Sequence, residues 1–263
     1  MYENILHIII LTGILMISTT GWRTGLLTLS GAIASVIVAN VMYWSLGWEG
    51  LIVLASFFVS SSVWSKWKME EKMNVEEKSA KTSHRDWQQV TANGGPASLF
   101  SMLYAINGAE VWLLAFLAAL AAANADTWAS EIGVLSRWRP LSIRTFKVVE
   151  SGTSGAISVL GTLATIVGAL FIALIGTVIF FEWDFSILVV ITLLGIIGSF
   201  LDTFLGAFVQ VEFRCTICGI NTESKYHHHL QTVHEKGILF INNEVVNAAS
   251  GVVAGAMTLF FYV

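Results

Sequence analysis

The chain has 263 residues, of which 55% are hydrophobic and only 12% are charged. Soluble domains carry roughly 25% charged residues, which keep their surfaces hydrated. The low charge therefore excludes a soluble globular protein, and the high apolar content excludes a disordered chain. The net charge of -4 also argues against nucleic acid as a partner. The remaining fold class is all-α: a polytopic membrane helix bundle embedded in a lipid bilayer.

Apolar runs along the chain predict about eight transmembrane helices with short loops, because a helix needs about 20 apolar residues to cross a bilayer. In chain order the runs cover residues 5–20, 25–44, 50–65, 95–106, 111–132, 154–181, 185–209 and 245–262. The first run follows Glu3 and has no basic leader, so we expect a retained helix rather than a cleaved signal. Residues 1–263 are expected to form a single integral membrane domain, with cytoplasmic loops at about 66–92 and 210–243.

All 14 Lys and Arg residues fall in alternate loops of this scheme, and the opposite loops carry only acidic charge. The basic residues are Arg23; Lys66, Lys68, Lys72, Lys78, Lys81 and Arg85; Arg137, Arg139, Arg144 and Lys147; and Arg214, Lys225 and Lys236. By the positive-inside rule, these loops lie in the cytoplasm and both termini lie outside. For a single lysine within 66–81, a purely topological role in a solvated segment is an equal alternative.

Three acidic residues lie within the predicted spans: Asp126, Glu131 and Asp202. Ionisable groups in the membrane are costly and are functional candidates by default. The fifth and seventh spans both run toward the cytoplasm, so these acids lie near that face, where nucleotides are found. Asp126 and Asp202 can meet across two helices and hold Mg²⁺, which prefers oxygen ligands. A structural hydrogen bond between helices is the alternative for Asp126.

Glycine and hydroxyl residues gather where the even-numbered spans begin at the same face. Asn93-Gly94 opens the fourth span, 151–155 (SGTSG) opens the sixth, and Asn242-Asn243 opens the eighth. Free backbone N–H groups at helix starts bind phosphates, and glycine allows close approach. These segments could hold a polyphosphate, although simple helix caps and packing residues are the alternative.

The loop at 210–243 contains both cysteines of the chain, Cys215 and Cys218, and a group of histidines at 227–229 and 234. A closed structural zinc site needs four nitrogen or sulfur ligands. Cys215, Cys218, one histidine of 227–229 (His229 in the preferred set) and His234 could supply them. A loop without metal is the alternative.

Several motifs together resemble a family of integral membrane proteins that includes plant phytyl-phosphate kinase and vertebrate transmembrane protein 19. The motifs are DTWASEIG at 126–133, KVVESGTSG at 147–155, RDWQQVTANGG at 85–95, DTFLGAFVQ at 202–210 and NNEVVN at 242–247. A more distant similarity is to CTP-dependent polyprenol kinases. Asp126, Ala129 and Gly133 match their first motif, whereas Ser151 interrupts the Glu-Gly pair of the second.

The resemblance implies a kinase that transfers a phosphoryl group from a nucleoside triphosphate, CTP above all, to an isoprenoid monophosphate. It implies catalytic roles for Asp126, Glu131 and Lys147, and Mg²⁺ binding by Asp126 and Asp202. Nucleotide or acceptor binding would involve Arg85, Asn93, Gly94, Glu150, Gly152, Thr153, Ser154, Gly155, Asn243 and Asn247. The alternative function is a transporter or carrier of a phosphorylated lipid or an ion. The sequence leaves the acceptor chain length and the oligomeric state open.

Overall fold

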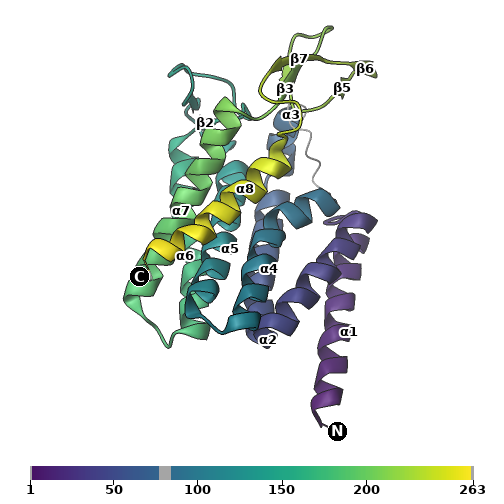
Figure 1. Ribbon diagram of the computed structural model, residues 1–263. Helices are drawn as coiled ribbons and strands as arrows, with labels where there is room; N and C mark the ends of the chain where they lie inside the picture. The colour runs from purple at the N-terminus through teal and green to yellow at the C-terminus, as the bar shows by residue number, and fades with distance from the viewer. Residues whose placement is uncertain (1, 77–83, 262–263) are drawn as a thin grey trace.

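The computed structural model describes residues 2–76 and 84–261 and is a polytopic helix bundle, as the sequence predicts (Figure 1). Lys78, Lys81 and the end of the last predicted span at Tyr262 lie outside the described residues. The helices are α1 (Tyr2–Arg23), α2 (Leu29–Lys66), α3 (Met69–Glu76), α4 (Trp87–Asn107), α5 (Glu110–Gly133), α6 (Val159–Phe180), α7 (Phe185–Phe208), α8 (Asn243–Ala256) and the 3₁₀ helix η1 (Met257–Phe260). Five described helices are long and apolar enough to cross a membrane: α1, α2, α5, α6 and α7.

Helix α2 contains the second and third predicted spans, joined at Gly47. This glycine has φ 70° and ψ −158°, which only a residue without a side chain adopts readily. The chain reverses there, because the end of α2 returns to the segment that precedes its start: Lys66 Nζ donates to the carbonyl oxygen of Thr24, 3.2 Å away. Helix α2 therefore forms two helical segments of the bundle, one on each side of Gly47.

Helix α5 is the centre of the bundle (Figure 1). In the most apolar 18-residue stretch of α5, 78% of the residues are buried inside the protein, whereas the corresponding share in α1 is 17%. Alanines along α5 lie against glycines of its neighbours: a Cβ added at Gly168 of α6 would lie 3.1 Å from Ala125 Cα, and one at Gly195 of α7 2.8 Å from Ala121 Cβ. Small residues let helices approach closely in a membrane, where packing rather than the hydrophobic effect drives association.

Capping side chains fix where several helices begin. Asp86 accepts from Gln89 N at the start of α4, Ser158 from Gly161 N at the start of α6, and Asn242 from Val245 N at the start of α8. Two predicted boundaries are therefore wrong. Helix α4 begins eight residues before residue 95, and α6 begins at Val159 rather than at residue 154.

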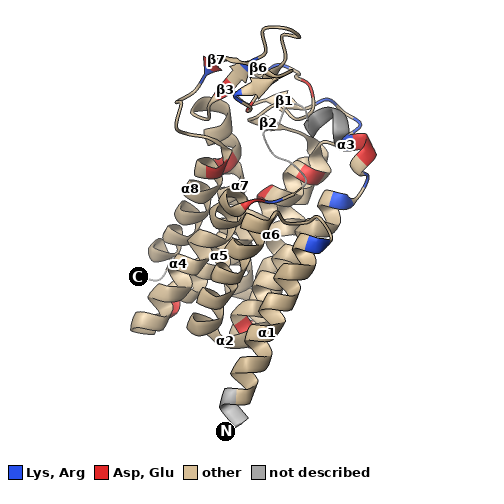
Figure 2. Ribbon diagram, turned by 90° about the vertical axis from the view of Figure 1, so that its right-hand side faces the viewer, with Lys and Arg blue, Asp and Glu red and all other residues tan. Residues whose placement is uncertain are grey.

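Two of the loops contain short strands that the sequence did not predict. Strands β1 (Leu141–Ser142) and β2 (Ala156–Ile157) pair antiparallel before α6. In the long loop between α7 and α8, β3 (Glu212–Arg214) lies between β4 (Asn221–Thr222) and β7 (Val233–Lys236), while β5 (Tyr226–His227) pairs with β6 (Leu230–Gln231). Figure 2 shows Lys and Arg in the half of the molecule that carries these strands and α3, whereas the far end shows Asp and Glu.

Candidate functional site

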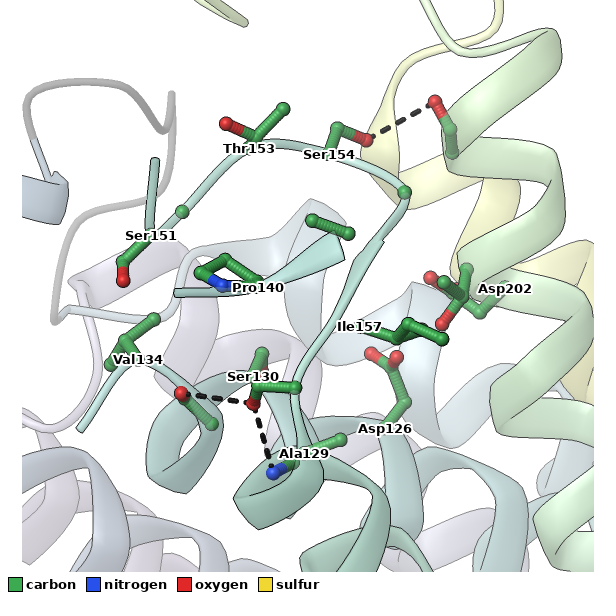
Figure 3. A pocket seen from close by; sticks show the side chains of 18 of the residues that line it. Asp126, Ala129, Ser130, Val134, Pro140, Ser151, Thr153, Ser154, Ile157 and Asp202 are labelled. Carbon is green, nitrogen blue, oxygen red and sulfur yellow. Dashed lines mark hydrogen bonds between the residues drawn. The ribbon is translucent and has the colours of Figure 1, made fainter. Parts of the chain in front are cut away.

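A cavity of about 270 Å³ lies at the strand-bearing end of the bundle (Figure 3). Its walls come from the last turns of α5 and α7, the first turns of α6, the start of α8 and the loop at 151–158. Lys72 of α3 and Glu223 of the long loop also line it. Segments far apart in the sequence therefore meet around one polar space.

Asp126 of α5 and Asp202 of α7 face one another across this cavity (Figure 3). Asp126 is half-buried and Asp202 is 8% exposed. The side chains come from helices packed through Ala121, Ala122, Gly195 and Gly198, so their separation is set by a tight helix contact. Two carboxylates in one half-buried space repel one another, and a divalent cation bound between them would offset that repulsion.

Helix α8 supports Asp202 from the side. Ser250 Oγ donates to Asp202 Oδ2 at 3.3 Å. With its amide nitrogen turned toward the same oxygen, Asn247 donates to Oδ2 at 2.7 Å and to the Asn243 carbonyl oxygen at 3.2 Å. Asn243 lines the cavity, whereas Asn247 contributes to the site indirectly, through its hydrogen bond to Asp202.

The segment 151–155 crosses the cavity as a loop, not as the first turn of a helix. Gly152 and Gly155 have φ of 80° and 73°, which ends any regular helix there. Thr153 Oγ1 donates to the Glu150 carbonyl oxygen at 2.8 Å, and Ser154 Oγ donates to the Gly206 carbonyl oxygen at 3.2 Å (Figure 3). Residues 151–158 all line the cavity, so the predicted glycine and hydroxyl segment does reach it.

Lys72 and Glu131 form an ion pair at the cavity wall. Lys72 Nζ lies 2.8 Å from Glu131 Oε2 and donates to the Trp64 carbonyl oxygen at 2.6 Å. The side chains are 6% and 26% exposed. Both Asp126 and Glu131 line the cavity, although five residues separate them on α5.

The long loop covers the cavity from the aqueous side. Gln210 Nε2 donates to Glu223 Oε1 at 2.6 Å, and both residues line the space. Gly237, in the same loop, packs against the backbone of Gln210: a Cβ added at Gly237 would be 2.0 Å from the Gln210 carbonyl oxygen. The strand-bearing loop is therefore part of the site.

The charge of the lining is strongly acidic. Among the described residues it contains Asp126, Glu131, Asp202 and Glu223, and Lys72 is the sole basic side chain. Such a site repels a polyphosphate unless a cation neutralises it. The oxygen donors present fit Mg²⁺, which commonly binds through one or two carboxylates plus substrate phosphates.

Several residues that the sequence predicts for the site lie outside the cavity lining. Lys147 and Glu150 are exposed on the hairpin before the loop at 151–155. Asn93 and Gly94 lie inside α4, where Asn93 Nδ2 donates to Gln89 O and Gly94 packs on Val38. They are not at a helix start, because Asp86 begins the helix two turns earlier.

Arg85 has a structural position at the edge of the site. Its backbone bonds to Leu26 and Thr28, and its guanidinium lies 5.7 Å from the ring centroid of Phe58. Burial lowers the pKa of Arg85, and the Glu131 carboxylate opposes this. Arg85 thus contributes positive potential near Glu131 without lining the cavity.

A second group of side chains converges in the long loop, away from the cavity. The ligand atoms of Cys215, Cys218, His227 and His228 all lie within 4.8 Å of one another. Hydrogen bonds from the Cys218 backbone N–H and with the His227 side chain lower the pKa of the Cys215 thiol to about 6.

The predicted partners His229 and His234 are replaced in this group by His227 and His228. His234 lies on β7 opposite Phe213, with Nε2 3.0 Å from the Gly237 carbonyl oxygen. His229 occupies the second position of the turn between β5 and β6. Strand pairing, which the spacing of histidines does not reveal, determines which of them reach the cysteines.

Sequence reasoning missed Lys72, Gln210 and Glu223 as parts of the site. All three belong to polar segments without apolar periodicity, where a buried charge cannot be told from a solvated one. Gln210 had a weak signal, because it ends the DTFLGAFVQ motif.

Comparisons with known proteins agree with this architecture. The chain is 34% identical over 232 residues to an uncharacterized membrane protein of Methanocaldococcus jannaschii, covering 88% of this chain and 84% of that protein. It is 30% identical over 226 residues to Protein PGR of Arabidopsis thaliana, covering 77% and 78% of the two chains. Similarity to the chloroplastic Protein VTE6 of Arabidopsis thaliana is 30% over 157 residues, which cover 57% and 46%. No solved structure matches the chain. The model of the family described as integral membrane protein DUF92 matches residues 12–255, and the chain belongs to that family.

Proposed function

We propose that this protein is a membrane-embedded kinase that transfers a phosphoryl group from a nucleoside triphosphate, preferentially CTP, to an isoprenoid monophosphate. The product is the isoprenoid diphosphate, and the second product is the nucleoside diphosphate. The resemblance to the phytyl-phosphate kinase family motivates the reaction class. The proposed active face is the cytoplasmic one.

The observation that carries the proposal is the pairing of two features in one cavity. Asp126 and Asp202 face one another, and the loop at 151–155 passes over them with two glycines and three hydroxyl residues. Phosphoryl transfer requires positioning and charge neutralisation more than covalent chemistry. Carboxylates that can hold a cation, beside a loop rich in glycine and hydroxyl residues that can hold phosphate, meet both requirements.

Each group has a defined task in this proposal. Asp126 and Asp202 would hold Mg²⁺, which when bound neutralises phosphate charge. The backbone N–H groups of Gly152 and Ser154 would bind donor phosphate oxygens, while Lys72 adds positive charge at the wall. Asn247 and Ser250 keep the Asp202 carboxylate oriented.

The state of Glu131 favours a monophosphate acceptor over an alcohol. Glu131 Oε2 accepts a hydrogen bond from Lys72 Nζ at 2.8 Å, so this oxygen is already engaged and is not placed to take a proton from an alcohol. A phosphate monoester needs no such base, because its oxygen is already ionised. That oxygen forms a new bond to the γ-phosphorus as the bond from the γ-phosphorus to the β-phosphate oxygen breaks, and the electron pair leaves with the nucleoside diphosphate.

An apolar face leads from the bilayer to this site. Phe200 lines the cavity and is also 41% exposed, and Ile197 and Leu193 continue from it along α7 toward the bilayer with 41% and 52% exposure. Residues three or four apart share one face of a helix. We propose that the isoprenoid tail lies along these side chains while its phosphate enters the cavity.

A transporter would require a polar path to the opposite membrane face. Beyond the buried Asn124, the described core of α5 consists of closely packed apolar residues from Leu113 to Ala122. This packing favours a site that opens to one face, as an enzyme needs.

The test is an assay of the purified full-length protein in detergent with Mg²⁺. CTP, ATP, GTP and UTP labelled on the γ-phosphate are each combined with prenyl alcohols and prenyl monophosphates of several lengths. We expect label in an isoprenoid diphosphate with CTP and a monophosphate. No labelled lipid with any pair, from folded protein, would contradict the proposal.

The matched variants are Asp126→Asn and Asp184→Asn. We expect Asp126→Asn to lower turnover by about 10²-fold or more, as for loss of a group that stabilises transition-state charge. Asp184 caps α7 at the opposite end, where asparagine also caps well, so Asp184→Asn should keep full turnover. Full activity of Asp126→Asn would overturn the assignment of Asp126.

A further inference from the structure

The turn at Cys215–Gly219 has the geometry of a metal-binding knuckle. The Ile217 N–H points at Cys215 Sγ, 3.4 Å away, and Gly219 N donates to the Cys215 carbonyl oxygen at 3.0 Å. Gly219 has φ 71°, which lets the chain turn back so that Cys215 N donates to Ile220 O at 3.0 Å. Both sulfurs therefore lie on the same side of a closed turn.

A second, independent turn brings two histidines to these sulfurs. Strands β5 and β6 are joined by His228 and His229, which have φ of 52° and 62°. Non-glycine residues seldom adopt this conformation in succession outside tight hairpins. The result is that His227 Nδ1 lies 3.5 Å from Cys218 Sγ, and His228 joins the same group.

We propose that Cys215, Cys218, His227 and His228 bind one Zn²⁺ ion. Two thiolates and two imidazoles are the ligand set of closed, tetrahedral structural zinc sites, and they do not suit Mg²⁺ or Ca²⁺. The four ligand atoms already lie within 4.8 Å of one another, and small side-chain rotations close such a group around an ion. With four protein ligands the site leaves no position for substrate, so its role is structural.

The position of this zinc site connects it to the cavity. Cys215 directly follows β3, whose neighbour β4 leads into Glu223. Glu223 accepts from Gln210 inside the cavity lining. The ion would therefore fix the small sheet that holds Glu223 over the site. The zinc assignment itself does not depend on the proposed kinase activity, because its test measures metal.

The experiment uses full-length protein with its affinity tag removed, produced with added zinc and dialysed against metal-free buffer. Elemental analysis should find about one zinc per chain. The matched variants are His228→Asn and His229→Asn, which place the same residue, one tolerant of positive φ, at adjacent positions of one turn. We expect His228→Asn to lose the bound zinc and His229→Asn to retain it.

A spectroscopic measurement covers the case of a variant that folds poorly. Wild-type protein stripped of zinc and loaded with Co²⁺ should show the intense visible absorption of tetrahedral thiolate-bound cobalt, and Cys218→Ser should lose it while keeping helical circular dichroism. Wild-type protein that contains no zinc and gives no such cobalt spectrum would overturn the proposal. Equal zinc loss in His228→Asn and His229→Asn would overturn the ligand set.

Discussion

Lys72 Nζ lies 2.8 Å from Glu131 Oε2, although α3 and α5 are separated by more than thirty residues of sequence that include the whole of α4. Lys72 is 5% exposed and also bonds to the Trp64 carbonyl oxygen. The pair therefore ties the short helix α3 to the wall of the cavity.

Replacing Lys72 by methionine should destabilise the protein. The change leaves Glu131 without its cation in a partly desolvated position, and loss of one partner of a buried pair costs about 3 kcal/mol. Thermal unfolding in detergent should therefore show a clearly lowered midpoint. The double variant Lys72→Met/Glu131→Gln should recover part of the loss, because no charge is then left unpaired.

Lys68 provides the control for this prediction. It lies just before α3 and pairs with Glu71 of that helix at 3.0 Å, but the two side chains are 44% and 58% exposed. Exposed pairs contribute about 0–1 kcal/mol, so Lys68→Met should leave the midpoint almost unchanged. Equal effects of the two lysine substitutions would show that Lys72 and Glu131 are not a buried pair.

Replacing Asp202 by asparagine should weaken the Mg²⁺ binding on which turnover depends. Asparagine keeps an acceptor for Ser250 but removes one of the two charges that would bind the cation. We expect the Mg²⁺ concentration for half-maximal rate to rise about tenfold or more, because even neighbours of a metal ligand change affinity by that factor. The measurement is a Mg²⁺ titration of the rate, with Asp184→Asn as the charge-matched control on the same helix. An unchanged titration would remove Asp202 from the metal site.

The features that the sequence predicted well are those that a membrane makes energetically expensive. Apolar length identified most of the spans, and the cost of a charge in the bilayer singled out Asp126 and Asp202, which the structure brings into one cavity. Gly47 marks the break between two predicted spans, since no apolar pattern continues through it.

What the sequence did not reveal depends on contacts between loops. The segment at 151–155 reads as a helix start, yet Ser158 is the cap, and β1–β2 pairing holds the segment as a loop. Lys72 lies in a polar helix of eight residues whose own pattern does not show which side is buried. Long-range pairings of this kind leave no local periodicity to detect.

Replacing Gly155 by alanine should damage the loop over the cavity. Gly155 has φ 73°, and an added Cβ would lie 2.3 Å from Ala207 Cβ. The backbone conformation alone costs an alanine about 1–2 kcal/mol, and relief of the clash displaces either the loop or the end of α7. We expect lower thermal stability and a large loss of turnover.

Gly13 offers a matched substitution at a harmless position. It lies within α1, and no atom outside its own helix lies within 4 Å of an added Cβ. Alanine is favoured over glycine in a helix interior by about 1 kcal/mol, so Gly13→Ala should equal or exceed the wild type in stability. If Gly155→Ala behaved in the same way, the loop would not be held as the structure describes.

The sidedness of the charges predicts which loops an impermeant probe can reach. The turn between α6 and α7 carries Glu182, and an epitope inserted before the exposed Trp183 should be accessible to antibody on intact cells. An epitope inserted next to the exposed Phe146, in the hairpin that precedes the cavity loop, should be detected only after permeabilisation. Both positions are outside helices, where insertions are tolerated best. The reverse pattern would turn the cavity away from cytoplasmic nucleotides, and it would therefore contradict the kinase proposal as well as the predicted topology.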